Sequence, residues 1–394
     1  MVPITYNLRN LVERKATTLM TALGIGLTVA VLVSSLAMTE GLRMLFAGSG
    51  DPRQFLVLRK GTDAELMSSV DNEVYQTIRQ FEGIARTGAD QPPEGVPANE
   101  PLVSPEGLAV VTLTSVDQAA GNVSVRGVLP IGLSMRQLEV TQGKMFNPSL
   151  RQVVVGASIA QRYPGARLNR KVQFGKGDWE VVGIFRAGDS AANNEIWVDL
   201  NQLRGDFERA SGSSSLLVRA QSPAAIPDLK KKIEADQRLG MNVIGEKDYY
   251  AGMTSAGAPL EYLGYTVAVI MAVGAAFAAT NTMYAAVARR SKEIGTLRAL
   301  GFSRGAILIS FIGESVCLAL IGGILGVLLA LPINGLATGV GNFTTFTDVT
   351  FKFRVSPRAV FWGLAFAGII GALGGFLPAY GASKKDIVQA MRDA

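Results

Sequence analysis

Four long apolar runs constrain the fold of this chain more than any other feature of its sequence. Ala16–Thr39, Tyr262–Ala288 and Ala359–Ser383 contain no charged residue, and Gly305–Leu331 contains one, Glu314. About 20 apolar residues in a helix cross the hydrocarbon core of a bilayer, so each run is long enough to span a membrane. We therefore predict an α-helical membrane protein with four transmembrane helices, at residues 17–39, 259–288, 305–331 and 359–383.

The charges that flank these runs predict how the helices are oriented. Residues 1–15, 289–304 and 384–394 together hold 11 basic and four acidic side chains, whereas 332–358 holds three basic and one acidic. Because cytoplasmic loops carry an excess of lysine and arginine, we expect both chain ends and the 289–304 segment to be cytoplasmic. The amphipathic residues 1–16 then predict an interfacial helix, or else the first turns of the following span. We expect 332–358 to be an extracytoplasmic loop and 384–394 a cytoplasmic tail.

The long segment between the first two spans, residues 40–258, contains no run that could cross a membrane. Short valine-rich stretches bounded by glycine, proline or asparagine predict strands, while Glu73–Phe81 and Ala224–Asp236 predict helices. We therefore expect a large α+β extracytoplasmic domain inserted between helices 1 and 2. The expected strands are Ala109–Thr114, Asn122–Val128, Gln152–Val155, Lys171–Phe174 and Trp179–Phe185.

Composition excludes several classes of function. The net charge is +6, but Glu40–Glu261 holds 24 basic and 26 acidic residues, so the basic excess flanks the membrane and does not indicate binding of nucleic acid. The chain has no histidine, which excludes Ser-His-Asp hydrolases, Cys-His proteases and the common zinc sites. The single cysteine, Cys317, lies in an apolar run. No GxxxxGK[ST] phosphate loop occurs, so we expect no catalytic, metal or cofactor site here, and any ATP to be hydrolysed by another polypeptide.

The segment between the second and third spans carries the most specific pattern. Ala288–Ile307 reads ARRSKEIGTLRALGFSRGAI, in which Ile294, Leu297 and Leu300 recur at helical spacing and Gly301 follows where a helix would end. Its composition alone is equally consistent with a loop whose cations face lipid headgroups. The order of its residues, however, resembles the loop between the second and third membrane helices of MacB/FtsX-like ABC transporter permeases.

The resemblance implies a function. In that family the loop, here 289–304, is a coupling helix that docks into a groove on an ABC ATPase. The chain would then be the permease subunit of an ABC transporter that transmits ATP-driven motion to an extracytoplasmic domain for export or extraction of a substrate. Three further stretches, RGVLPIGLSMRQLEVTQGKMF, VVVGASIAQRY and WEVVGIF, resemble the MacB-like core domain of that family. The residues implied to couple to the ATPase are Arg289, Arg290, Lys292, Glu293, Ile294, Gly295, Leu297, Arg298, Leu300 and Gly301.

The same resemblance implies partners. They are a separate ABC ATPase that binds ATP and Mg²⁺, a second permease copy or paralogue, and the lipid of the inner cell membrane. A periplasmic adaptor and an outer-membrane channel are compatible further partners. Two related functions stay open: an FtsX-type regulator that transports nothing and activates a cell-wall hydrolase, and a lipoprotein-releasing permease.

Ionisable and amide side chains are nearly absent from the spans. Glu314 lies in the third span, where a carboxylate facing lipid costs roughly 2.5 kcal/mol or more, so we expect it to face a partner helix or a polar pocket. Asn281 is the notable amide of the second span. Because no second ionisable side chain lies inside the spans, we favour a packing role for Glu314 over a proton relay.

Helix length and small residues predict how the spans pack. Tyr262–Ala288 would be about 40 Å long as a helix, which exceeds the ~30 Å hydrocarbon core, so we expect the second helix to extend outward as a stalk. Gly322 and Gly326, and likewise Gly371 and Gly375, place glycines one turn apart. Such faces let helices approach closely, and we expect them to pair across a dimer.

Overall fold

The computed structural model describes residues 15–88, 92–136, 138–208, 212–255, 258–342 and 346–384. The expected interfacial helix at 1–16 lies almost entirely outside these residues, as does the tail expected at 384–394.

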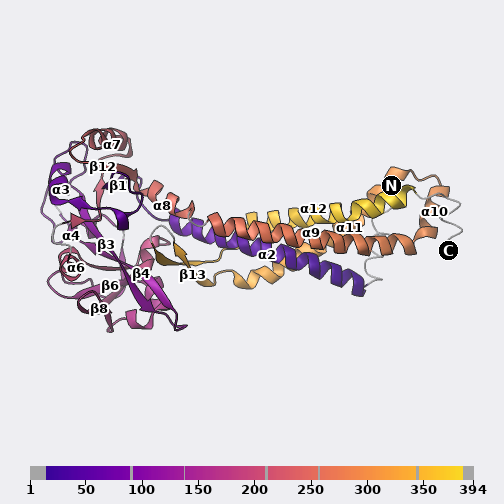
Figure 1. Ribbon diagram of the computed structural model, residues 1–394, viewed down its shortest axis with the longest axis horizontal. Helices are drawn as coiled ribbons and strands as arrows, with labels where there is room; N and C mark the ends of the chain where they lie inside the picture. The colour runs from indigo at the N-terminus through magenta and orange to yellow at the C-terminus, as the bar shows by residue number, and fades with distance from the viewer. Residues whose placement is uncertain are drawn as a thin grey trace. The chain divides into compact units, whose positions relative to one another are not determined.

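The chain divides into two compact units (Figure 1). One unit, Met1–Gly41 with Ala258–Leu336 and Lys352–Ala394, holds the membrane helices. The other, Leu42–Gly257 with Ala337–Phe351, is an α+β domain that we call the inserted domain.

Four helices are long and apolar enough to cross a membrane. They are α2 (Lys15–Ala47), α9 (Ala258–Arg289), α11 (Arg304–Ala330) and α12 (Pro357–Lys384). The four predicted transmembrane helices are thereby confirmed. The 33 residues of α2 and the 32 of α9 exceed the 20 or so that a span requires. A short helix, α10 (Ser291–Ala299), joins α9 to α11, and a single turn, η5 (Leu331–Ile333), follows α11.

Glycines bring α11 into close contact with two neighbouring helices of the same chain. A Cβ atom added to Gly322 would lie 2.7 Å from the carbonyl oxygen of Ala22 in α2, and Gly326 fits against Gly26 as tightly. A Cβ atom on Gly371 of α12 would lie 2.6 Å from the Cβ of Ala319 in α11.

Gly375 of α12 packs in the same way against Ser315 of α11, where an added Cβ atom would lie 2.6 Å from the serine Cβ. The expectation that both glycine pairs join two copies of the chain is therefore wrong for these faces, because α2, α11 and α12 already cover them within one chain. The glycines are needed because only they let the backbones approach this closely.

α9 packs mainly on α12. Thr280 donates a hydrogen bond to the carbonyl oxygen of Gly374 at 2.9 Å, and Thr282 shares one with Thr21 of α2 at 2.9 Å. The buried apolar side chains between the four helices are Ile25, Val29, Val33, Ala275, Ala319, Ala330, Ala367 and Ile370.

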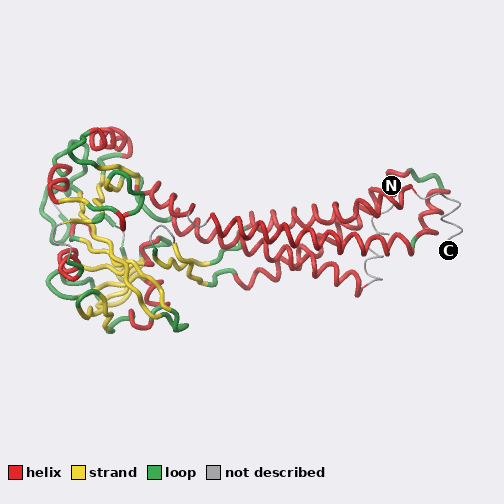
Figure 2. The backbone as a smooth tube through the Cα atoms, viewed as in Figure 1, coloured by secondary structure: helices red, strands yellow, loops and turns green. Residues whose placement is uncertain are grey.

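The inserted domain is built on one ten-stranded sheet, drawn in yellow in Figure 2. The strand order is β12-β1-β11-β3-β4-β9-β6-β8-β5, and β7 pairs with β8. The pairs β4–β9 and β6–β8 are parallel, and the others are antiparallel. The bounds are β1 (Gln54–Arg59), β3 (Val103–Thr114), β4 (Ala120–Val128), β5 (Glu139–Gly143), β6 (Gln152–Gly156), β7 (Lys171–Phe174), β8 (Gly177–Arg186), β9 (Glu195–Asp199), β11 (Ser215–Arg219) and β12 (Met241–Gly245). A separate pair joins β2 (Val70–Asp71) to β10 (Gly212–Ser213).

Two hydrophobic cores flank the long strand β3. One core lies on the β12-β1-β11 side under α3 (Asn72–Ile78) and α7 (Ile226–Ala235), and it includes Phe55, Ile78 and Ile233. The other lies under α5 (Ala157–Arg162) and α6 (Leu200–Asp206), and it includes Trp179. The remaining helices are α4 (Pro130–Ser134) and α8 (Glu246–Ser255), with single turns η1 (Glu65–Met67), η2 (Pro164–Ala166), η3 (Ala191–Asn194) and η4 (Pro223–Ala225).

A hairpin from the loop between the third and fourth membrane helices belongs to the inserted domain. It consists of β13 (Ala337–Asn342) and β14 (Thr347–Lys352). The Asn194 side chain exchanges two hydrogen bonds with the backbone of Thr350, at 2.9 and 3.0 Å. Phe351 is 3% exposed. The inserted domain is therefore assembled from two parts of the chain that are more than 70 residues apart.

Candidate functional site

The short helix α10 carries the residues that the sequence predicts to couple to an ATPase. It lies at the end of the membrane helices where α12 ends (Figure 1). Arg290 breaks the helix between α9 and α10, with φ −102° and ψ 18°. Gly301 has φ +91°, a left-handed conformation that glycine adopts at little cost, and it turns the chain toward α11. The hydroxyl of Ser303 then accepts a hydrogen bond from the backbone of Ala306 and caps α11.

α10 has an inner and an outer face. Ser291, Ile294 and Gly295 are buried, and Ile294 packs in a cluster with Ile307 and Phe311 of α11. The outer face exposes Arg289, Lys292, Glu293, Thr296 and Leu300, while Leu297 and Arg298 are half-buried.

Leu300, the residue directly after α10, is 72% exposed and is the most exposed large apolar side chain at this helix. The predicted set of coupling residues is thus divided by the structure. Arg290, Ile294 and Gly295 face the membrane helices and are not available to a docking protein, because the helical twist turns them inward. Leu300, Arg289 and Lys292 are exposed.

Arg290 forms a buried ion pair with Glu314. The Nη1 atom of Arg290 donates to Oε2 of Glu314 at 2.7 Å, and the two residues are 4% and 5% exposed. Glu314 does face a polar partner, as expected, but the partner is an arginine that we had predicted to lie on the coupling surface. The sequence offers a hint that we missed, because a lone carboxylate ten residues into an apolar helix requires a cation within reach, and Arg290 belongs to the adjacent basic turn.

The next residue of α11 connects the pair to α12. The Ser315 hydroxyl donates a hydrogen bond to the carbonyl oxygen of Gly371 at 2.7 Å. Two consecutive residues of α11 therefore contact different elements. Glu314 binds Arg290 at the corner between α9 and α10, and Ser315 binds α12.

Asn281 lies on the opposite, uncovered side of α9. Its neighbours Thr280 and Thr282 contact α12 and α2, whereas the Asn281 side chain is exposed and the described residues offer it no hydrogen-bond partner. The same face exposes Ile270, Phe277 and Tyr284.

A second polar centre lies inside the inserted domain, around Arg126. Its guanidinium donates to Glu65 at 2.9 Å, to Glu106 at 2.7 Å and to Glu195 at 2.8 Å. Burial would raise the pKa of Glu65, but the charge of Arg126 and the hydrogen bonds that it donates outweigh burial and lower that pKa to about 2. Arg136 continues the network by pairing with Glu106 at 2.8 Å.

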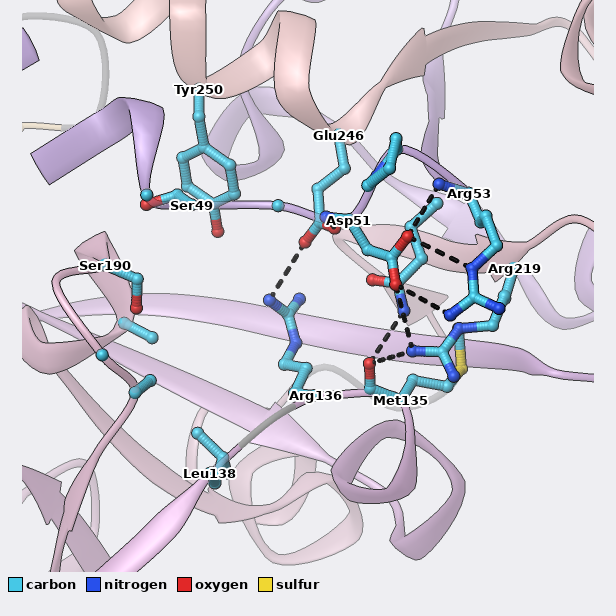
Figure 3. A pocket seen from close by; sticks show the side chains of 17 residues that line it. Ser49, Asp51, Arg53, Met135, Arg136, Leu138, Ser190, Arg219, Glu246 and Tyr250 are labelled. Carbon is cyan, nitrogen blue, oxygen red and sulfur yellow. Dashed lines mark hydrogen bonds and ion pairs between the residues drawn. The ribbon is translucent and has the colours of Figure 1, made fainter. Parts of the chain in front are cut away.

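A pocket of about 480 Å³ adjoins this network (Figure 3). Glu246, at the start of α8, reaches down to Arg136 at 3.3 Å and accepts the backbone N–H of Asp51 at 2.9 Å. Asp51 in turn pairs with Arg53 at 3.3 Å and Arg219 at 3.8 Å. Burial raises the pKa of Glu246 in spite of Arg136.

The pocket is therefore lined by carboxylates that already have guanidinium partners. Among the residues that the structure describes, no group of three or more histidine, cysteine, aspartate or glutamate side chains is arranged to hold a metal ion. The arrangement of charges at this site serves to connect segments of the chain to one another.

Comparison with known proteins decides the family. Residues 18–236 match the model of the MacB-like periplasmic core domain, and residues 265–387 match that of the FtsX-like permease C-terminal region. The chain belongs to the MacB/FtsX-like ABC transporter permease family. The first of these matches covers most of α2 and the inserted domain up to the end of α7, and the second covers α10 and most of the other three membrane helices.

This permease resembles characterised and uncharacterised relatives at low identity. It is 27% identical over 366 residues to the macrolide export ATP-binding/permease protein MacB of Agrobacterium fabrum, covering 85% of this chain and 55% of that protein. It is 24% identical over 418 residues to the uncharacterized ABC transporter permease YknZ of Bacillus subtilis, covering 99% and 98% of the two chains. The permease thus spans about half the length of the MacB relatives that it matches.

Two solved structures align with part of this chain. The extracellular domain of YknZ aligns with a TM-score of 0.36 and 16% identity, over 48% of this chain and 99% of that one. The periplasmic region of MacB from Actinobacillus actinomycetemcomitans aligns with a TM-score of 0.37 and 13% identity, over 52% and 94%.

Proposed function

We propose that this permease receives force from a separate ABC ATPase through α10 and transmits it to the inserted domain, which drives export or extraction of a substrate. The observation that carries the proposal is the exposed side of α10, a short, sharply bounded helix with basic side chains at its start and an exposed leucine directly after its end. Leu300 offers an apolar group that a groove can bury, and Arg289 and Lys292 offer charge to fix its orientation. ATP and Mg²⁺ belong to the ATPase in this scheme.

The orientation follows from the same assignment. An ATPase acts in the cytoplasm, so α10 and both chain ends lie on the cytoplasmic side of the inner membrane, and the inserted domain lies outside. The basic excess of the flanking segments supports this orientation.

We infer a second permease copy or paralogue from the open face of α9. An amide such as that of Asn281 is costly against lipid and is satisfied when it meets a polar group of another helix. Since α2, α11 and α12 cover the other side of α9, a second permease chain is the occupant that this face favours. An adaptor and an outer-membrane channel are further candidate partners of the inserted domain.

The docking assignment is tested with Leu300→Asp. The permease is purified from native membranes with the ATPase that accompanies it, and bound ATPase and ATP hydrolysis are measured. We expect Leu300→Asp to lower the amount of bound ATPase at least tenfold, because a carboxylate replaces the apolar group that enters the groove. Leu150→Asp, an equally drastic change at an exposed leucine of the inserted domain, is the matched control and retains the ATPase. If Leu300→Asp retains it as well, α10 is not the docking element.

The match of residues 265–387 to an FtsX-like region is compatible with one alternative from another functional class. In that alternative the permease transports nothing and regulates a cell-wall hydrolase. A peptidoglycan hydrolase in the purified complex, stimulated by ATP, would support the regulator. A bound lipoprotein would instead support a lipoprotein-releasing permease.

A further inference from the structure

The buried ion pair between Arg290 and Glu314 is not needed for the packing of the helices. Both side chains are almost completely buried at the corner where α9 turns into α10. A buried ion pair is poor at stabilising a fold, because apolar residues of similar volume usually do so as well or better. What it provides is a specific, directional connection between two elements.

The ion pair adds a second connection to the one that runs through the chain from α10 to α11. After Ala299, where α10 ends, the chain reaches Arg304 of α11 through a short turn. That turn contains Gly301 in a left-handed conformation, next to the exposed Leu300. The backbone N–H groups of Gly301 and Phe302 donate to the carbonyl oxygens of Arg298 and Leu297, both at 3.1 Å, so the turn is an ordered helix end that joins only the C-terminal end of α10 to α11.

The ion pair bypasses that turn. Arg290 is fixed at the corner by hydrogen bonds from its backbone N–H to the carbonyl oxygens of Ala286 and Val287, both at 3.2 Å. Its guanidinium holds Glu314, ten residues into α11. From there the Ser315 hydroxyl holds α12 through the carbonyl oxygen of Gly371.

We propose that Arg290 and Glu314 are positioning residues that lock the α9–α10 corner to α11, so that a displacement of α10 moves α9, α11 and α12 as one body. This inference rests on the proposed function, because it presumes that an ATPase displaces α10. It assigns to Arg290 a role in transmission in place of a role in docking.

The test measures whether the corner and α11 move together. Spin labels are placed at Ala288→Cys and Ile309→Cys, both exposed, in a Cys317→Ser background, and the complex with its ATPase is studied without nucleotide and with a non-hydrolysable ATP analogue. We expect one narrow distance distribution that is the same in both states. Arg290→Glu or Glu314→Arg should broaden it or make it depend on nucleotide, and the double charge swap should restore it.

Two controls make the outcome decisive. Arg289→Glu reverses the charge of the exposed neighbouring arginine and should leave the distribution narrow. Glu314→Gln keeps the size of the side chain and removes its charge, and it replaces the reversal variants if these do not reach the membrane. The lock is refuted if the distribution stays narrow in Arg290→Glu, Glu314→Arg and Glu314→Gln, or if the swap fails to restore it. Absence of a bound ATPase in the parent protein would refute the proposed function instead.

Discussion

At the scale of single residues, two arginines organise the polar interior of the chain. Arg290 neutralises the only carboxylate of the membrane interior that the structure describes, and Arg126 pairs with three carboxylates inside the inserted domain. The three partners of Arg126 could not be predicted from the sequence, because they are between 20 and 69 residues away from it and nothing in their local pattern links them. What the sequence did show was the need for a partner, since a buried charge must be compensated.

The charge network around Arg126 makes the inserted domain sensitive to acid. The pKa of Glu65 is about 2 in the folded chain and near its ordinary 4.5 in the unfolded chain. Its contribution to stability is therefore complete above about pH 4.5 and is lost as the pH falls toward 2, by at most about 3 kcal/mol. We expect Glu65→Gln to lower the stability at neutral pH and to flatten its decline between pH 4.5 and 2.

Unfolding by denaturant is followed through tryptophan fluorescence, because Trp179 and Trp197 are buried in the inserted domain. Glu180→Gln, at an exposed carboxylate of β8, is the control and should leave the decline in stability between pH 4.5 and 2 unchanged. If the stability of Glu65→Gln declined between pH 4.5 and 2 as steeply as that of the wild type, other groups would be responsible for the decline.

At the scale of elements, the sequence was most informative where composition alone decides the structure. The four membrane helices follow from uncharged runs, and the five expected strands coincide with parts of β3, β4, β6, β7 and β8. The strands β1, β9 and β11 were missed because they are buried on both faces and do not alternate. The parallel pairing of β4 with β9 depends on a crossover of almost 70 residues, which no local pattern encodes.

The glycines of α11 were recognised, but their partners were not. A GxxxG pattern predicts close approach without saying which helix approaches. We expect Gly326→Ala to destabilise the membrane helices by about 1–3 kcal/mol, because the added methyl group would overlap the backbone of α2.

Gly313→Ala is the matched control, since it adds the same methyl group to the same helix where no atom lies within 4 Å. It should leave the helices as stable as before or slightly more stable, because alanine favours helix over glycine. Thermal unfolding in detergent, followed through the loss of helical circular dichroism, measures both variants. Equal melting temperatures for the two would contradict the tight contact between α2 and α11.

At the scale of the whole molecule, the inserted domain is not a single insertion. The hairpin β13–β14 comes from the loop between the third and fourth membrane helices and contributes the buried Val349 and Phe351 to the domain. We therefore expect a soluble fragment of residues 42–255 joined by a flexible linker to 337–351 to melt several degrees above the fragment without the hairpin. Asn194→Ala should remove part of that gain, because it deletes the two hydrogen bonds to Thr350. Identical melting temperatures for the two fragments would mean that the hairpin contributes nothing to the domain.

The split origin of this domain limits how relatives of this permease can exchange parts. Recombination that replaces the long insertion as one block would place a foreign surface against the hairpin of the recipient. The hydrogen bonds that Asn194, Arg162 and Asn122 donate to hairpin residues would then be lost or mismatched. A workable hybrid has to be cut in four places, so that both chain segments come from the same parent.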